Sequence, residues 1–154
     1  MVSISMPNFI EFKVDKFTFR IALDRLYSTE GLWVMREDNH VRIGISDYLQ
    51  QRSGDVAFTE VKPKGTVVTF GEELAVIETI KVNISLSSPV TGRVLEVNPA
   101  METAPEAINQ DPYGAGWLAV LEATEGETHL EQLLDPQAYF AKIKLEAEQE
   151  VKKE

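Results

Sequence analysis

The stretch GTVVTFGEELAVIETIKVNISLSSPVTGRV, residues 65–94, decides the fold that we expect for this chain. Short apolar runs alternate here with Gly, Pro, Ser and Glu, which predicts strands over residues 74–79 and 82–86 with turns on either side. Only Ile80 and Lys81 separate these two strands. Closely spaced short strands of this kind are typical of a small β-sandwich or flattened barrel.

Lys81 stands in the short connection between the two predicted strands. The tip of a tight hairpin directs its side chains into water, while the paired backbone beneath stays rigid. A modifying enzyme can therefore reach this amine from outside. Acylation would remove the charge of the lysine and turn its side chain into a neutral tether. A long arm on a rigid base raises the local concentration of its tip around docked enzymes.

The rest of the chain also predicts mainly strands, joined by short helices. The further strands cover residues 12–21, 32–36, 41–45, 56–61, 66–70, 93–97 and 117–121, and the first of them reads as an edge strand. Ser46 is placed to cap a short helix that Gly54 ends, and residues 106–110 predict another. A C-terminal helix is predicted because apolar residues recur every four positions, at Tyr139, Ile143, Ala147 and Val151.

Charge and hydropathy exclude several classes of partner. The chain has 154 residues, with 15 Lys and Arg against 25 Asp and Glu, which gives a net charge of −10 at pH 7. Such a chain lacks the basic surface that nucleic acid requires, so we expect no nucleic-acid partner. It contains no apolar stretch of about 18 residues, and its N-terminus does not read as a secretory signal. We therefore expect a cytoplasmic protein with no membrane partner.

Motifs of unaided catalysis are missing from the sequence. The chain has no cysteine, which excludes thiol catalysis, disulfides and zinc–thiolate sites. It has no nucleophile elbow, zinc-protease motif, phosphate loop or dinucleotide fingerprint, and no set of residues with metal-ligand spacing. Either the protein only binds, or its reactive group is added to it.

The surroundings of Lys81 resemble the biotinyl/lipoyl attachment domain, and a wider set of motifs resembles the H protein of the glycine cleavage system. In family order between Leu26 and Leu121, these motifs are IGISDY (43–48), GDV (54–56), VIETIK (76–81), SPVTG (88–92), VN (97–98) and NQDPYGAGWL (109–118). The resemblance implies a mainly β fold. It would be a flattened barrel or sandwich hybrid motif of the lipoyl/biotinyl type, with short flanking helices and the C-terminal helix.

The same resemblance implies a carrier that is not itself an enzyme. Lipoate would be attached to Lys81 in amide linkage, and its arm would shuttle a covalently bound intermediate between partner enzymes. Glu78, Ile80 and Val82 are then the residues by which a lipoate ligase or lipoyl transferase recognises the hairpin, although Glu78 also reads as a plain exposed carboxylate. Dihydrolipoamide dehydrogenase is a further implied partner. The resemblance also suggests three parts: an N-terminal extension (1–25), the lipoyl-carrier domain (26–122) and a C-terminal helical tail (123–154).

Two departures from the family pattern bear on the cargo. Glycine cleavage H proteins carry a Lys-Glu-His-Glu-Trp-like stretch where this chain has Thr29-Glu30-Gly31-Leu32-Trp33, and the alanine after their lysine is Val82 here. Residues 19–28 and 31–33 are similar to lipoyl proteins of a heterodisulfide-reductase-like sulfur-oxidising system. This favours a carrier of a sulfur intermediate that works with such a complex. The alternative is a carrier of the aminomethyl group that works with the glycine cleavage enzymes.

Two other interpretations stay open at this point. A biotin carrier is a second alternative, but biotin hairpins usually have Met on both sides of the lysine, where this chain has Ile80 and Val82. A scaffold protein that has lost the modification is the other, and it predicts that Lys81→Arg leaves function intact.

Overall fold

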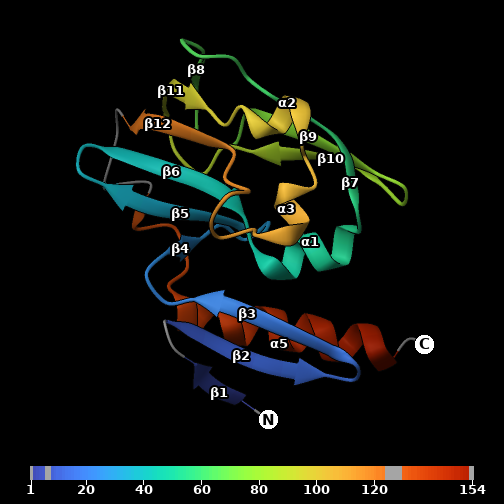
Figure 1. The fold of residues 1–154 in the computed structure, drawn as a ribbon. Coiled ribbons are helices and arrows are strands. Elements are labelled where there is room, and N and C mark those ends of the chain that lie inside the picture. The colour runs from blue at the N-terminus through green and yellow to red at the C-terminus, as the bar shows by residue number, and fades with distance from the viewer. Residues whose placement is uncertain (1, 6–7, 124–129, 153–154) are drawn as a thin grey trace.

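The computed structural model describes residues 2–5, 8–123 and 130–152 (Figure 1). Its strands are β1 (Val2–Ser5), β2 (Phe9–Val14), β3 (Phe17–Ala22), β4 (Leu26–Tyr27), β5 (Leu32–Glu37), β6 (His40–Ile45), β7 (Val56–Val61), β8 (Val67–Val68), β9 (Glu73–Thr79), β10 (Asn83–Ser87), β11 (Gly92–Val97) and β12 (Ala119–Ala123). Its helices are α1 (Asp47–Ser53), α2 (Ala100–Thr103), α3 (Ala107–Gln110) and α5 (Pro136–Lys152).

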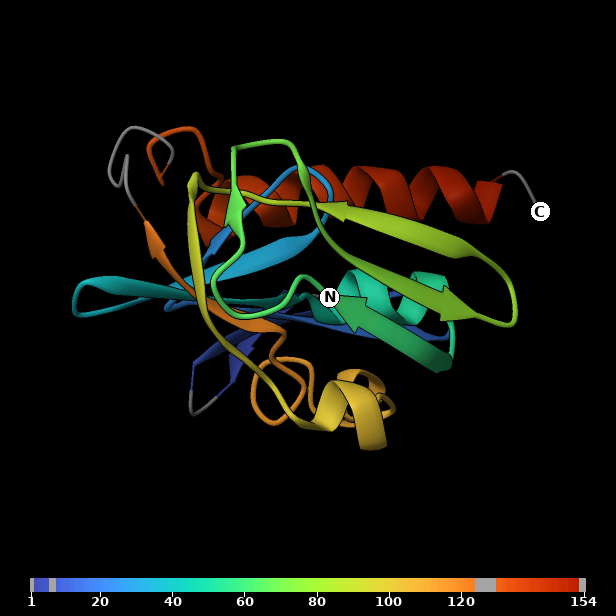
Figure 2. The ribbon, with the colours of Figure 1, turned by 90° about the horizontal axis from the view of Figure 1, so that it is seen from above.

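Two antiparallel sheets enclose the main core. The larger has the strand order β4-β5-β6-β12-β11-β8, and the smaller has the order β10-β9-β7. Figure 2 shows the smaller sheet crossing over the larger one. Side chains of both sheets meet in one apolar cluster, to which Leu32 and Ile43 contribute from the larger sheet and Leu74, Ile77 and Leu86 from the smaller. The expected mainly β fold with short helices and a C-terminal helix is thereby confirmed.

The N-terminal segment forms a separate sheet, β1-β2-β3, and not the single edge strand expected over residues 12–21. The chain reverses at Asp15 and Lys16, where Asp15 has φ 55°, and β2 pairs with β3 from Phe9–Ala22 to Val14–Phe17. Aspartate is among the few residues that adopt this left-handed conformation readily, which explains a turn without glycine. The prediction of one strand was therefore wrong, since both halves of a hairpin lie in that stretch.

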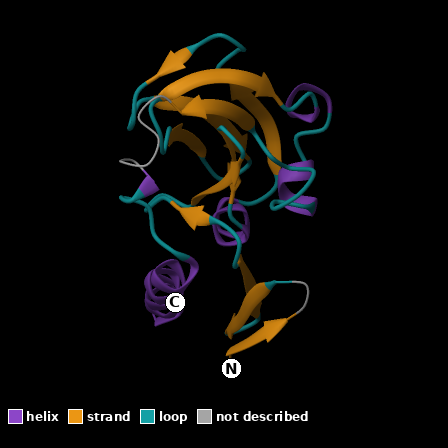
Figure 3. Ribbon diagram, turned by 90° about the vertical axis from the view of Figure 1, so that its left-hand side faces the viewer, coloured by secondary structure: helices purple, strands orange, loops and turns teal. Residues whose placement is uncertain are grey.

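Figure 3 shows helix α5 and the N-terminal sheet beneath the barrel, and their buried side chains contribute to a second apolar cluster. The predicted four-residue repeat places Tyr139, Ile143 and Ala147 inside, where they pack with Ile10 and Phe12 of β2. The Tyr139 ring also stacks on that of Tyr27, with 4.3 Å between ring centroids. The N-terminal sheet and α5 are thus packed together, while the division at residues 25/26 and 122/123 stays a prediction.

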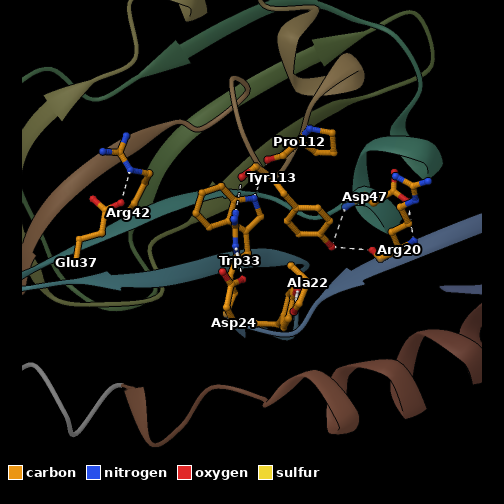
Figure 4. Close-up of polar contacts among 11 residues, drawn as sticks. Arg20, Ala22, Asp24, Trp33, Glu37, Arg42, Asp47, Pro112 and Tyr113 are labelled. Atoms are coloured by element: carbon orange, nitrogen blue, oxygen red, sulfur yellow. Dashed lines mark hydrogen bonds and ion pairs between the residues drawn. The ribbon is translucent and has the colours of Figure 1, made fainter. Parts of the chain in front are cut away.

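Polar contacts join the N-terminal segment to the barrel (Figure 4). The Tyr113 hydroxyl donates to the Arg20 carbonyl at 2.8 Å, and the Arg20 amide donates to the Asp47 carboxylate at 2.9 Å. The Trp33 indole, fully buried, donates to the Pro112 carbonyl at 2.8 Å. The first two contacts join β3 to the 111–117 loop and to α1, and the third joins that loop to β5.

Several element boundaries differ from those predicted. The strand expected over 66–70 is reduced to β8, and the closing strand expected at 117–121 begins two residues later, at Ala119. Helix α2 was not predicted, while α3 lies within the predicted 106–110. Helix α1 begins and ends as predicted: the Ser46 side chain accepts a hydrogen bond from the Leu49 amide, and Gly54 follows the last turn with φ 90°.

Candidate functional site

Lys81 lies at the tip of the β9–β10 hairpin. Glu78 pairs with Asn83, and the Thr79 amide donates to the Val82 carbonyl at 2.8 Å, so that the turn itself consists of Ile80 and Lys81. The Thr79 hydroxyl accepts from the amides of Lys81 and Val82, at 3.2 and 3.1 Å, and donates to the Val82 carbonyl. The predicted two-residue connection is confirmed, and Thr79 fixes its backbone by local hydrogen bonds.

The side chains at the tip of this hairpin are exposed to solvent, whereas side chains further along its strands are buried in the core. Ile80 is 92% exposed and Val82 is 42% exposed, while Ile77 and Leu86, lower in the same hairpin, are buried. Lys81 itself is exposed. Among the described residues, no hydrogen bond or ion pair engages its ammonium group. An amine in this state is free to be acylated by an enzyme that approaches the tip from outside.

Glu78, the third residue proposed for enzyme recognition, lies on β9 three residues before the lysine. It is exposed and stands opposite Asn83 of β10 on one side and Phe58 of β7 on the other. Phe58 is also half exposed. The structure therefore places Glu78, Ile80 and Val82 on one exposed hairpin around Lys81, and their role in recognition stays a prediction.

Gly54 has a second role beyond ending helix α1. Its backbone lies in a region that residues with a side chain avoid, with φ 90° and ψ −169°. A Cβ at this position would stand 3.7 Å from Cδ and 3.9 Å from Cε of Lys81. The lysine side chain therefore passes over the end of α1, a contact that the sequence alone did not indicate.

We expect Gly54→Ala to lower the free energy of unfolding by about 1–3 kcal/mol, because alanine is strained in this backbone conformation. The new methyl group would make only ordinary van der Waals contact with Lys81, so the lysine should remain reactive. Chemical denaturation measures the first effect. An unfolding free energy equal to that of the original protein would contradict this account of Gly54.

Two cavities adjoin the hairpin. The first, of about 370 Å³, opens between β10, α1 and α5 and is lined by Thr29, Glu30, Gly31, Tyr48, Leu49, Arg52, Ser53, Val82, Asn83, Ile84, Tyr139, Lys142, Ile143 and Glu146. The second, of about 210 Å³, includes Lys81 in its wall, with Val14, Phe17, Phe19, Tyr48, Gln51, Arg52, Ala147, Glu150 and Val151. Of the lining residues, the sequence pointed to Lys81, Val82 and the 29–33 stretch, but it did not indicate that α1, β3 and α5 complete the walls, because these elements are distant in sequence.

Part of the 29–33 stretch, which departs from the family pattern, lines the first cavity. Gly31 is buried with φ 104°, and a Cβ there would stand 3.0 Å from Cβ of Leu49 and 3.3 Å from the Tyr139 hydroxyl. A side chain such as the histidine of the family pattern would be strained at this φ, and its neighbours would have to move by a few tenths of an ångström to admit even its Cβ. Glu30 is turned to β10, where its carboxylate accepts from the Ser87 amide at 3.2 Å. Leu49 of α1 and Tyr139 of α5 thus crowd the space next to Gly31.

Charged groups between the two cavities are paired with one another. The Arg52 guanidinium donates to the Tyr48 hydroxyl at 2.8 Å and lies 3.5 Å from the Glu150 carboxylate. Burial raises the pKa of the Tyr48 phenol, which therefore stays protonated at neutral pH. The hydrogen bond to Tyr48 in turn raises the pKa of Arg52. Within residues 2–5, 8–123 and 130–152, no three acidic or histidine side chains gather as a metal site would require.

The helices of the described chain are too short or too polar to cross a bilayer.

Comparisons with known proteins agree with this architecture. A sequence model of the family described as "Glycine cleavage H-protein" matches residues 25–146. The H protein of Thermus thermophilus is 41% identical over 128 residues, which are 82% of this chain and 98% of that protein. A probable H protein 1 of Sulfolobus acidocaldarius is 37% identical over 82% of this chain and 91% of its own length. A crystal structure of a Mycobacterium marinum H protein superimposes with a TM-score of 0.72 at 33% identity, covering 79% of this chain and 97% of that one.

Members of this family are non-catalytic carriers, and they hold lipoate covalently on a lysine. The family match covers the barrel, the β9–β10 hairpin and most of α5, whereas β1, β2 and β3 lie before it. From the fold, the exposed hairpin lysine and these similarities together, we conclude that this chain belongs to the glycine cleavage H-protein family of lipoyl carriers.

Proposed function

We propose that Lys81 is the lysine of this chain to which lipoate is attached. The observation that carries the proposal is the place of its amine, exposed in a two-residue turn whose backbone is fixed by Thr79. The residues fit the group, since the tip is open to solvent and no described residue competes for the ammonium. Lipoate supplies a dithiolane that can be opened, loaded and closed again.

The residues of this chain anchor the arm and present it. Lys81 provides the amide nitrogen, and Gly54 leaves room for its methylenes. The exposed apolar side chains of Ile80 and Val82, with Glu78 beside them, offer a contact surface to a lipoate ligase or lipoyl transferase. The exposed position also lets dihydrolipoamide dehydrogenase reach the end of the arm. We place all of these encounters in the cytoplasm.

We further propose that the partner enzymes are those of glycine cleavage, with the aminomethyl group as cargo. Support comes from the relatives, whose printed names describe glycine cleavage H proteins at about 40% identity. These names favour the glycine cleavage role over the sulfur-carrying role that the departures around Trp33 suggested. Gly31 keeps the sulfur-carrying role as a second candidate, because its crowded site and its φ of 104° disfavour a side chain such as the family histidine.

The test is glycine-dependent exchange of labelled bicarbonate with a glycine decarboxylase and the lipoylated protein. We expect exchange with the original chain and none with Lys81→Arg, while the Thermus thermophilus H protein serves as the positive control. A lipoylated chain that supports no exchange in an assay where the control is active would contradict the glycine cleavage assignment. Streptavidin blotting of the same sample separates a biotin carrier from a lipoyl carrier.

A further inference from the structure

The turn that carries Lys81 closes without the backbone conformation that short hairpins usually use. Two-residue hairpin loops favour turns in which one or both central residues have a positive φ, because such turns match the twist of the strands. Outside glycine, the described residues with a positive φ are Asp15 and Asp38, so neither Ile80 nor Lys81 has one. A β-branched residue such as Ile80 also avoids positive φ. This turn therefore needs another source of stability.

The Thr79 side chain supplies that stability. Its hydroxyl accepts hydrogen bonds from the amides of Lys81 and Val82, at 3.2 and 3.1 Å, and donates to the Val82 carbonyl at 3.2 Å. A hydroxyl has one donor and two acceptor positions, and all three are used here. Threonine hydroxyls can imitate a backbone turn in this way. One side chain thus holds the backbone on both sides of the Lys81 Cα.

Thr79 is itself fixed to the sheet. Its amide donates to the Val82 carbonyl at 2.8 Å, and it stands opposite Val56 of β7. Val56 is buried, and its amide donates to the Asn109 side chain at 2.9 Å. Thr79 is half-buried, so water competes less for its hydroxyl than it would at an open tip. The backbone of Lys81 is therefore tied to β7 and β9 through the Thr79 hydroxyl.

We propose that Thr79 is a positioning residue for the acylation of Lys81, because its hydroxyl holds the turn in the conformation that the modifying enzyme binds. The inference rests on the proposed attachment of lipoate to Lys81. The contacts of the hydroxyl are with backbone groups and not with the Lys81 amine. Thr79 therefore acts on how well the enzyme binds this carrier and not on the chemical step.

The chemical step is the same with and without the hydroxyl. The Lys81 ammonium loses one proton, and its nitrogen attacks the carbonyl of an activated lipoyl group held by the ligase. The amide bond forms, the bond from that carbonyl to the activating group breaks, and the activating group leaves with the electron pair. The nitrogen then gives up a second proton to become the neutral amide.

Steady-state lipoylation by a lipoate ligase, with lipoate and ATP in excess and the unmodified carrier varied, tests the proposal. Thr79→Val replaces the hydroxyl by a methyl group and removes all three hydrogen bonds. If the variant adopts the original turn in about one-tenth of its molecules, the KM for the carrier rises about tenfold, since the apparent affinity follows the competent fraction. The value of kcat should not change. Thr79→Ser keeps the hydroxyl and should return the KM to within about twofold of the original.

Thr66→Val is the matched control. Thr66 is also half-buried in a turn, where its hydroxyl donates to the Pro63 carbonyl at 2.7 Å, but that turn precedes β8 and does not include Lys81. Its substitution should leave the KM unchanged. Acylation of Lys81 by a small reagent such as acetic anhydride should proceed at one rate in all these proteins, because it requires only an exposed amine. Exchange of the Val82 amide hydrogen should be faster in Thr79→Val alone.

An unchanged KM for Thr79→Val, a lower kcat without a change in KM, or a failure of Thr79→Ser to restore the KM would each overturn the positioning role. Slower acylation of Thr79→Val by acetic anhydride would also overturn it, since the amine would then have lost its exposure. These results leave Lys81 as the attachment site. An original chain that gains no lipoyl mass at Lys81 would instead overturn the proposed function, and the role of Thr79 with it.

Discussion

Replacing Lys81 by arginine is expected to abolish lipoylation and with it all carrier activity. The guanidinium keeps its charge and is not a substrate for amide formation with lipoate. Because Lys81 is exposed and its ammonium has no partner among the described residues, the free energy of unfolding should change by no more than about 0.5 kcal/mol. Intact-protein mass and the bicarbonate exchange assay measure the loss, and chemical denaturation checks the fold.

Lys64→Arg is the matched control, since Lys64 is also exposed in a turn between strands. It should be lipoylated and active like the original protein. Carrier activity retained by Lys81→Arg would mean that the scaffold interpretation is right, or that another lysine holds the arm.

Trp33→Ala should produce the largest loss of stability, about 3–5 kcal/mol, which is the usual cost of removing a fully buried large aromatic side chain. The indole donates to the Pro112 carbonyl at 2.8 Å, and the Arg25 guanidinium lies 4.4 Å from the ring centroid. A Cβ at Gly44 would overlap the indole, so the neighbouring strand is shaped to this side chain. The substitution leaves a cavity and an unpaired carbonyl where the barrel meets the N-terminal segment.

Thermal and chemical unfolding measure this effect. For a domain of this size, each 1 kcal/mol corresponds to a shift in Tm of about 2–4 °C. Trp117→Ala is the comparison, because Trp117 is only partly buried and its ring is covered by Arg42 at 4.3 Å. Its loss should be clearly smaller. Equal losses for the two tryptophans would show that Trp33 has no special place between the two cores.

The β9–β10 hairpin could be predicted because its information is local. Alternating apolar residues set the strands, and the spacing of Glu78, Lys81 and Pro89 matched a known pattern. Ser46 and Gly54 likewise marked the ends of α1 through their own side-chain and backbone chemistry. Such local features can be predicted from the sequence without knowing which residues pack against them.

The cavity walls could not be predicted in this way. Phe17 and Val151 line the same cavity although they lie near opposite ends of the chain, and no local pattern indicates that they share it. The β2–β3 turn was missed because Asp15 and Lys16 carry no glycine or proline signal. For Gly54, the sequence indicated a helix end, but only the fold brings the Lys81 side chain over it.

The most direct test of the central claim is peptide mass spectrometry of the protein purified from a host with lipoate and an active lipoate ligase. The proposal predicts a lipoyl amide on Lys81, in the peptide that contains residues 76–82. Finding Lys81 unmodified under these conditions, or finding the lipoyl group on a different lysine, would contradict it.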